Sequence, residues 1–63
     1  MSEPFDIFRV EHLGVRWVDS AKTIEHAKNI VQQHAASAAG EYLVLDQRTG
    51  DKFTIKHSQE LAN

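Results

Sequence analysis

The sequence predicts a small α+β domain, a two-layer sandwich of order ββαββ with one helix packed on a four-stranded, mostly antiparallel sheet. Residues 5–18 and 41–56 each hold two short runs of aromatic and β-branched residues around a turn, which is typical of hairpins. Residues 23–39, between them, repeat apolar positions with the period of a helix. A lone helix buries its apolar side only against the sheet, which predicts two layers.

The strands are expected at residues 5–10, 15–18, 41–46 and 52–56. Gly14 ends the first turn and is free to take a positive φ. In the second connection, Gly50 suits the left-handed position of a bulged hairpin. If the first and third strands are neighbours, the strand order 2-1-3-4 makes every pairing antiparallel, and we favour that order.

The helix has recognisable ends. Thr23 is the expected N-cap, with Ser20 as the alternative one turn earlier, and Gly40 is expected to end the helix. Within it, one arc of the helical wheel holds mainly apolar residues, which predicts the side that faces the sheet. These residues are Ile24, Ala27, Ile30, Val31, His34, Ala35 and Ala38.

Length and composition limit the chain to one domain over residues 1–63, with an ordered core at about 5–56 and flexible ends. A chain of 63 residues buries only about 60% of its unfolded surface, so such domains often need a disulfide, a metal or self-association. With no cysteine, a disulfide and a thiolate zinc site are both excluded. The net charge of −2 argues against broad attraction to nucleic acid.

The start of the chain gives no sign of export. Residues 1–4 lack the positive charge and the apolar run of a secretion signal. No stretch approaches the roughly 18 apolar residues of a membrane span. We therefore expect a cytoplasmic protein without a membrane partner.

Alternation along the strands predicts two sheet faces. The face expected under the helix carries Phe8, Val10, Val15, Trp17, Leu43, Leu45, Phe53 and Ile55. The face expected to be free of the helix carries Ile7, Arg9, Arg16, Val18, Tyr42, Val44, Thr54 and Lys56. This assignment predicts that Trp17→Ala costs about 3–5 kcal/mol, and that Tyr42→Ser with Val44→Ser leaves the fold intact.

Several short segments carry a resemblance. They are Trp17-Val18-Asp19-Ser20-Ala21, Thr23 before a helix that holds Ala27, Gly40-Glu41-Tyr42, and Asp46-Gln47-Arg48-Thr49-Gly50. Together they make the chain, over roughly residues 8–55, resemble a loose group of short uncharacterised bacterial α+β proteins. The resemblance implies a shared fold, and it brings no activity and no functional residues.

No group of residues forms a recognisable catalytic or metal site. His26 and His34 are eight residues apart, not the three or four that place two ligands together on a helix. His34 lies in the apolar arc, where a structural role at the rim of the core outweighs a role as general base or pH switch. The segment 46–51 lacks the spaced acidic ligands of a calcium loop and is interpreted as a charged turn. We expect no cofactor, no metal and no enzymatic activity.

Two functions remain. The first is a protein–protein interaction module that uses the helix-free sheet face or a strand edge, with an unknown protein partner or as a homodimer. The alternative is a nucleic-acid-binding module that uses the basic residues of the same face beside one aromatic residue. Ionic strength distinguishes them, because phosphate contacts weaken steeply with salt. The candidate binding residues are Arg9, Arg16, Tyr42, Val44 and Lys56.

Overall fold

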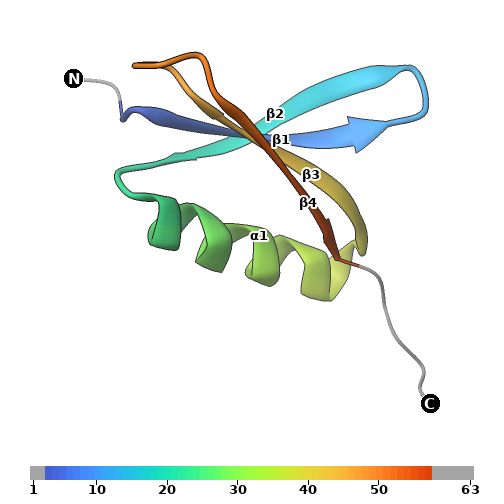
Figure 1. The fold of residues 1–63 in the computed structure, drawn as a ribbon. Helices are drawn as coiled ribbons and strands as arrows, with labels where there is room; N and C mark the ends of the chain where they lie inside the picture. The colour runs from blue at the N-terminus through green and yellow to red at the C-terminus, as the bar shows by residue number, and fades with distance from the viewer. Residues whose placement is uncertain (1–2, 58–63) are drawn as a thin grey trace.

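The computed structural model describes residues 3–57 and contains the predicted ββαββ elements. In chain order these are β1 (Phe5–Glu11), β2 (Gly14–Ala21), α1 (Ile24–Ser37), β3 (Gly40–Asp46) and β4 (Lys52–His57). The helix lies against one side of the sheet, and the turn end of the β1–β2 hairpin projects beyond the layers (Figure 1). The predicted α+β fold is confirmed.

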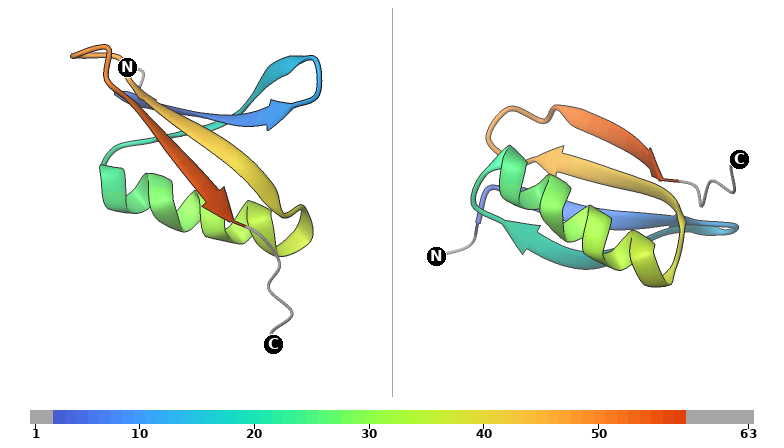
Figure 2. Two further views of the ribbon diagram at one scale, coloured as in Figure 1. Left: turned by 45° about the vertical axis from the view of Figure 1, so that its right-hand side comes forward. Right: turned by 90° about the horizontal axis from the view of Figure 1, so that it is seen from below.

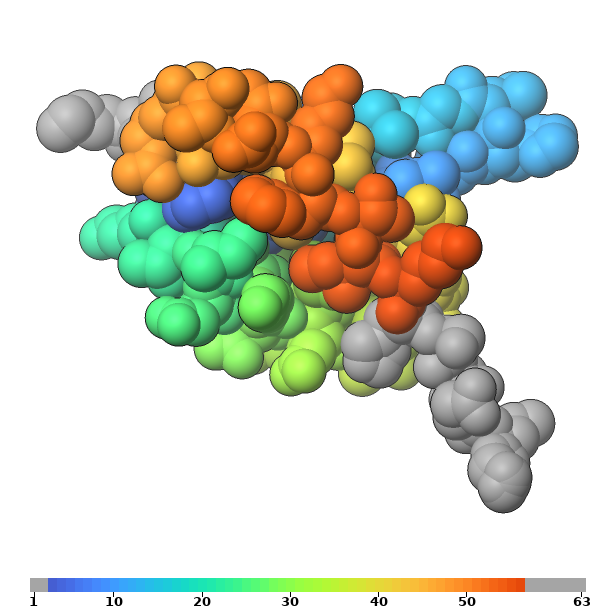
Figure 3. All heavy atoms as spheres, viewed as in Figure 1, coloured from blue at the N-terminus to red at the C-terminus, as the bar shows by residue number. Residues whose placement is uncertain are grey.

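The sheet has the predicted strand order β2-β1-β3-β4. Every neighbouring pair is antiparallel, so β2 and β3 run in the same direction on either side of β1. The helix connects these two strands and crosses a single face of the sheet, as Figure 2 shows from below. The space-filling view shows the β1–β2 turn standing clear of the remaining atoms (Figure 3). Among residues 3–57, no helix covers the other face of the sheet.

Both ends of the helix are capped by nearby groups. The Thr23 hydroxyl accepts a hydrogen bond from the His26 backbone N–H at 3.0 Å, which confirms Thr23 as the N-cap. At the other end, the Ala38 N–H donates to the His34 carbonyl at 2.8 Å. The prediction that Gly40 ends the helix is wrong, because the helix stops at Ser37 and Gly40 is the first residue of β3.

The core lies between α1 and the sheet. The helix contributes two alanines with Ile30 and Val31, as its apolar arc predicted, whereas His34 is exposed. The alanines have little volume, which lets the helix approach the strands closely. The buried apolar residues are Phe5, Ile7, Ala21, Ala27, Ile30, Val31, Ala35, Tyr42 and Val44.

For β1, β2 and β3, the predicted assignment of the two faces is wrong. Ile7 and Val44 pair in register, as do Arg9 and Tyr42, and these pairs lie on the helix side. The residues between them point to the other side, since strand side chains alternate. Thus Trp17 and Val15 are each 55% exposed, although both were expected under the helix. Also on the helix-free side are Phe8, Val10, Leu43 and Leu45.

The faces of β4 were predicted correctly. Ile55 pairs with Tyr42 and Phe53 with Val44, so both lie on the helix side. Ile55 packs against the core, whereas Phe53, on this edge strand, is 43% exposed. Thr54 and the lysines of β4 alternate with these residues and lie on the helix-free side.

A β-bulge interrupts the alternation of side chains on β2. Ile7 pairs with Asp19 but Phe8 pairs with Trp17, so Val18 is an extra residue between the two pairs. An extra residue changes which side chains share a face along the strand. Val18 therefore packs against the core, on the same side as Ala21.

The β3–β4 turn is organised by one carboxylate. The Asp46 side chain accepts a hydrogen bond from the Arg48 backbone N–H at 2.9 Å and pairs with the Arg48 guanidinium at 3.2 Å. The Gly50 N–H donates to the Asp46 carbonyl at 2.7 Å. Gly50 has a φ of +82°, which confirms the predicted left-handed position.

Candidate functional site

The helix-free side of the sheet carries a group of apolar side chains from three strands. In one row across the sheet, Trp17 pairs with Phe8, which pairs with Leu43. In the next row Val10 pairs with Val15. We call this group the open face, and it consists of Phe8, Val10, Val15, Trp17, Leu43 and Leu45.

Charged residues of both signs border the open face. Asp6 accepts a hydrogen bond from the Trp17 indole N–H at 3.3 Å and another from the Gln47 side-chain amide. Along β4, Lys52 pairs with Leu45 and Lys56 pairs with Glu41. The open face is thus an apolar patch bordered by carboxylates on β1 and β3 and by ammonium groups on β4.

The open face holds more large apolar side chains than are fully buried in the core. The largest fully buried side chains are Tyr42, Ile7, Val31 and Val44. The open face holds six apolar side chains, among them the single tryptophan of the chain. Contiguous apolar patches on small proteins are often interaction sites.

The predicted binding residues do not form one surface. Tyr42 and Val44 are 1% and 0% exposed and belong to the core, so their expected exposure is wrong. Their side chains point toward the helix because they pair with Arg9 and Ile7, which lie on that side of β1. Lys56 is exposed on the helix-free side.

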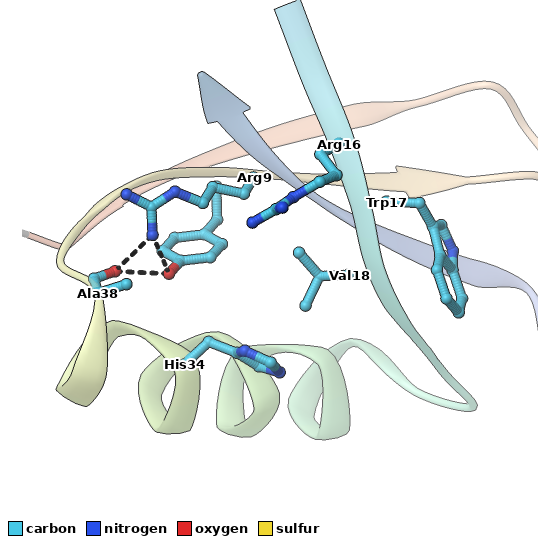
Figure 4. A pocket seen from close by; sticks show the side chains of 7 residues that line it. Arg9, Arg16, Trp17, Val18, His34 and Ala38 are labelled. Atoms are coloured by element: carbon cyan, nitrogen blue, oxygen red, sulfur yellow. Dashed lines mark hydrogen bonds between the residues drawn. The ribbon is translucent and has the colours of Figure 1, made fainter. Parts of the chain in front are cut away.

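Arg9 and Arg16 lie on the opposite side of the sheet from Lys56, so the predicted basic patch is divided between two faces. The two arginines pair directly across β1 and β2. They point into a pocket of about 360 Å³ between the sheet and the second half of the helix (Figure 4). The pocket is lined by Arg9, Arg16, Trp17, Val18, His34, Ala38 and Tyr42.

Hydrogen bonds fix one wall of this pocket. The Tyr42 hydroxyl donates to the Ala38 carbonyl at 2.6 Å. Nη1 of Arg9 donates to the same carbonyl at 3.2 Å and lies 3.4 Å from the Tyr42 hydroxyl. The guanidinium also lies 5.8 Å from the centre of the Tyr42 ring. Figure 4 shows these contacts, with His34 across the pocket.

The pocket has a positive lining. Among residues 3–57, no Asp or Glu side chain lines it. Glu11 pairs with Nε of Arg16 at 3.3 Å from outside the lining, and the two side chains are 41% and 70% exposed. Exposed ion pairs of this kind contribute little free energy, so Glu11 holds the Arg16 side chain only weakly.

The described residues offer no familiar catalytic or metal-binding group. Of the described residues that line the pocket, none is a serine, threonine or carboxylate that could work with His34. Within residues 3–57 there is no group of three or more His, Asp or Glu side chains placed to hold a metal ion. In the same range, no helix is long and apolar enough to span a bilayer.

Comparisons with protein-family models, with curated proteins and with solved structures found no match to this chain. The resemblance to short bacterial α+β proteins stays a prediction. We therefore infer function from the two surfaces described above, the open face and the pocket on the helix side.

The sequence indicated that an apolar sheet face is left uncovered, but the alternation of side chains could not show which face it is. Along β1 and β3, both alternating sets of residues are apolar, Ile7 and Val44 on one side and Phe8 and Leu43 on the other. A single helix covers only one side of a sheet. Two apolar sets therefore indicate an uncovered apolar face, whichever set the helix buries.

Proposed function

We propose that the protein is a non-enzymatic interaction module that associates through the open face. The observation that carries this proposal is the 55% exposure of Trp17 in a row with Phe8 and Leu43. Burying such side chains is favourable by about 25 cal/mol per Å² of apolar surface. An indole on a sheet face that no element of the described residues covers is a typical anchor for a protein partner.

The occupant we favour is a second copy of the chain. The charges around the open face include Asp6 and Glu41 together with Lys52 and Lys56, so a second copy can meet each sign with its opposite. The net charge of −2 imposes little repulsion between copies. Small domains with small cores also gain stability by oligomerisation.

The size of the face indicates the strength to expect. Four strands about 4.8 Å apart and six to eight residues long give a sheet of roughly 400 Å² in projection, of which the open face is a part. Specific interfaces bury about 800 Å² of accessible surface per partner, and smaller ones are weak or transient. We therefore expect association in the micromolar range, with monomer and dimer in exchange.

Sedimentation velocity over a concentration series tests the proposal. The wild type should shift from monomer toward dimer between about 1 and 500 µM, in keeping with a small interface. Trp17→Ser with Leu43→Ser should stay monomeric and folded. Gln33→Ser, an exposed change on the helix, is the matched control and should dimerise like the wild type.

The outcomes separate the alternatives. A wild type that is monomeric at every concentration would overturn self-association. Dimers that persist in the doubly substituted variant would place the interface elsewhere. Dimers that dissociate steeply with added salt would indicate a charged interface and would also contradict the proposal, because an apolar interface depends little on ionic strength.

A further inference from the structure

The pocket on the helix side has features that the open face does not explain. It lies across the sheet from most of the open face and is lined by groups from β1, β2, β3 and the end of α1. Its volume of about 360 Å³ is within the range of sites for small molecules. Trp17 borders the pocket but points away from Arg16 and Val18 (Figure 4).

Two arginines from adjacent strands line the pocket. Arg9 and Arg16 pair directly on adjacent strands, and like charges in that position destabilise a sheet. His34 lies across from them on the helix (Figure 4). Glu11 pairs with Nε of Arg16, and both side chains are exposed. A bound anion would relieve the repulsion between the guanidinium groups.

Arg9 is held in place without using all of its donors. It caps the end of the helix, since Nη1 donates to the Ala38 carbonyl. A guanidinium has five N–H donors, and these contacts use only those of Nη1. Nη2 lies 3.6 Å from the point where a Cβ on Gly40 would sit, so the glycine leaves room beside the guanidinium. Helix capping therefore uses only part of the hydrogen-bonding capacity of Arg9.

The remaining walls favour an organic anion over a bare ion. Val18, which is half-buried, supplies apolar surface in the pocket that the two arginines line. Arginine binds carboxylates and phosphates through paired N–H donors and also stacks on flat rings. We propose that this pocket binds a small organic anion, with a carboxylate or phosphate group between Arg9 and Arg16 and an apolar body against Val18.

Titration of the ¹⁵N-labelled full chain, followed by amide and arginine Nε–H resonances, tests the proposal. The probes are phenyl phosphate and benzoate, with benzyl alcohol as the uncharged control and inorganic phosphate as the control without an apolar body. We expect saturable shifts at Arg9, Arg16, Val18 and His34 with either aromatic anion, and none with benzyl alcohol. Inorganic phosphate should bind at least threefold more weakly than phenyl phosphate.

Matched variants distinguish a specific binding site from non-specific electrostatic attraction of the anion to the protein. Arg16→Gln removes an exposed side chain and should weaken phenyl phosphate at least tenfold. Lys56→Gln removes the same charge on the other face of the sheet and should leave the affinity unchanged. Arg9→Lys keeps the charge but not the paired donors, and it should also weaken binding at least tenfold.

Three results would overturn the proposal. One is the absence of saturable shifts up to 20 mM of both aromatic anions. Another is an equal loss of affinity in Lys56→Gln and Arg16→Gln. The third is a short single-stranded oligonucleotide that binds more tightly than phenyl phosphate with shifts spread over both faces, since that would indicate a nucleic-acid surface.

Discussion

The hydroxyl of Tyr42 donates a 2.6 Å hydrogen bond to the carbonyl oxygen of Ala38 and so joins β3 to the end of α1. The Tyr42 ring is buried while its hydroxyl reaches one of the carbonyls that the last helical turn leaves unpaired. The same carbonyl accepts from Arg9, whose side chain lines the pocket. One residue thus links the core, the helix end and the candidate anion site.

Tyr42→Phe should lower the free energy of unfolding by about 1 kcal/mol, which is typical for loss of one hydrogen bond while the ring stays packed. Urea denaturation followed by circular dichroism measures the change. The Arg9 Nε–H resonance should also broaden or shift, because one of the groups around its guanidinium is lost. Unchanged stability would mean that water replaces the hydroxyl at no cost.

Tyr42→Ser with Val44→Ser should unfold the domain, the opposite of what the sequence predicted. Both side chains are essentially buried, and truncating large core residues costs about 2–5 kcal/mol each. That sum meets or exceeds the few kcal/mol expected for so small a domain. A cooperative thermal transition near that of the wild type would restore the original assignment of faces.

Trp17→Ala should cost less than about 1 kcal/mol in a monomeric sample, whereas Ile7→Ala should cost about 2–5 kcal/mol. Trp17 is 55% exposed and Ile7 is fully buried. The measurement belongs at low micromolar concentration, because self-association through Trp17 would add concentration-dependent stability. Equal losses in the two variants would contradict the observed faces.

Gly50→Val should destabilise the fold by about 1–3 kcal/mol, since a β-branched residue is strained at positive φ. The φ of Gly50 is +82°, and no neighbouring atom lies within 4 Å of the position that a Cβ would take. The loss would therefore come from the backbone and not from a clash. Gly50→Asn, which tolerates this conformation better, should lose less, and chemical denaturation compares the two.

Asp46 should make stability depend on acid pH. Hydrogen bonds from the Arg48 side chain hold the pKa of the Asp46 carboxyl below its ordinary value of about 3.9. A carboxyl with a lowered pKa in the folded state stabilises the fold above its unfolded pKa. That stability is lost as the pH falls through the folded pKa.

Denaturation of the wild type and Asp46→Asn at about pH 6 and about pH 3 tests this dependence. The wild type should be the more stable protein at the higher pH, and the difference should shrink at the lower pH. Asp51→Asn, in the same turn, is the control for a general effect of removing a carboxylate. A difference between wild type and Asp46→Asn that stays constant with pH would contradict the role of the Arg48 contact.

The candidate site was only partly predictable. Among the described residues, one face of the sheet has no helix, as the sequence indicated. The placement of Arg9 and Arg16 on that face was wrong, because both lie on the helix side beside Tyr42. The sequence did not show that Lys56 lies on the other side from the two arginines, because a face is shared only after strand pairing is known. The pocket needed the helix end as well, since Ala38 and His34 are part of its lining.

Interactions between residues close together in the chain determined the helix, the strands and the turn of this protein. The Thr23 cap, the period of the helix, the turn at Gly50 and the four short strands each depend on neighbouring residues, so the sequence was enough to predict them. The strand order 2-1-3-4 was favoured because every pairing in it is antiparallel once the first and third strands are neighbours, and the structure has this order.

Only the tertiary structure decided which face of the sheet the helix buries. Both alternating sets along β1 and β3 are apolar, so transfer of side chains from water favours neither strongly. The choice depends on strand register, on the bulge at Val18 and on close packing against Ala27 and Ala35. These are contacts between residues far apart in the chain, and a one-residue change in pairing reverses every side chain of a strand. The Tyr42 ring is therefore core, and the Trp17 indole remains on the surface.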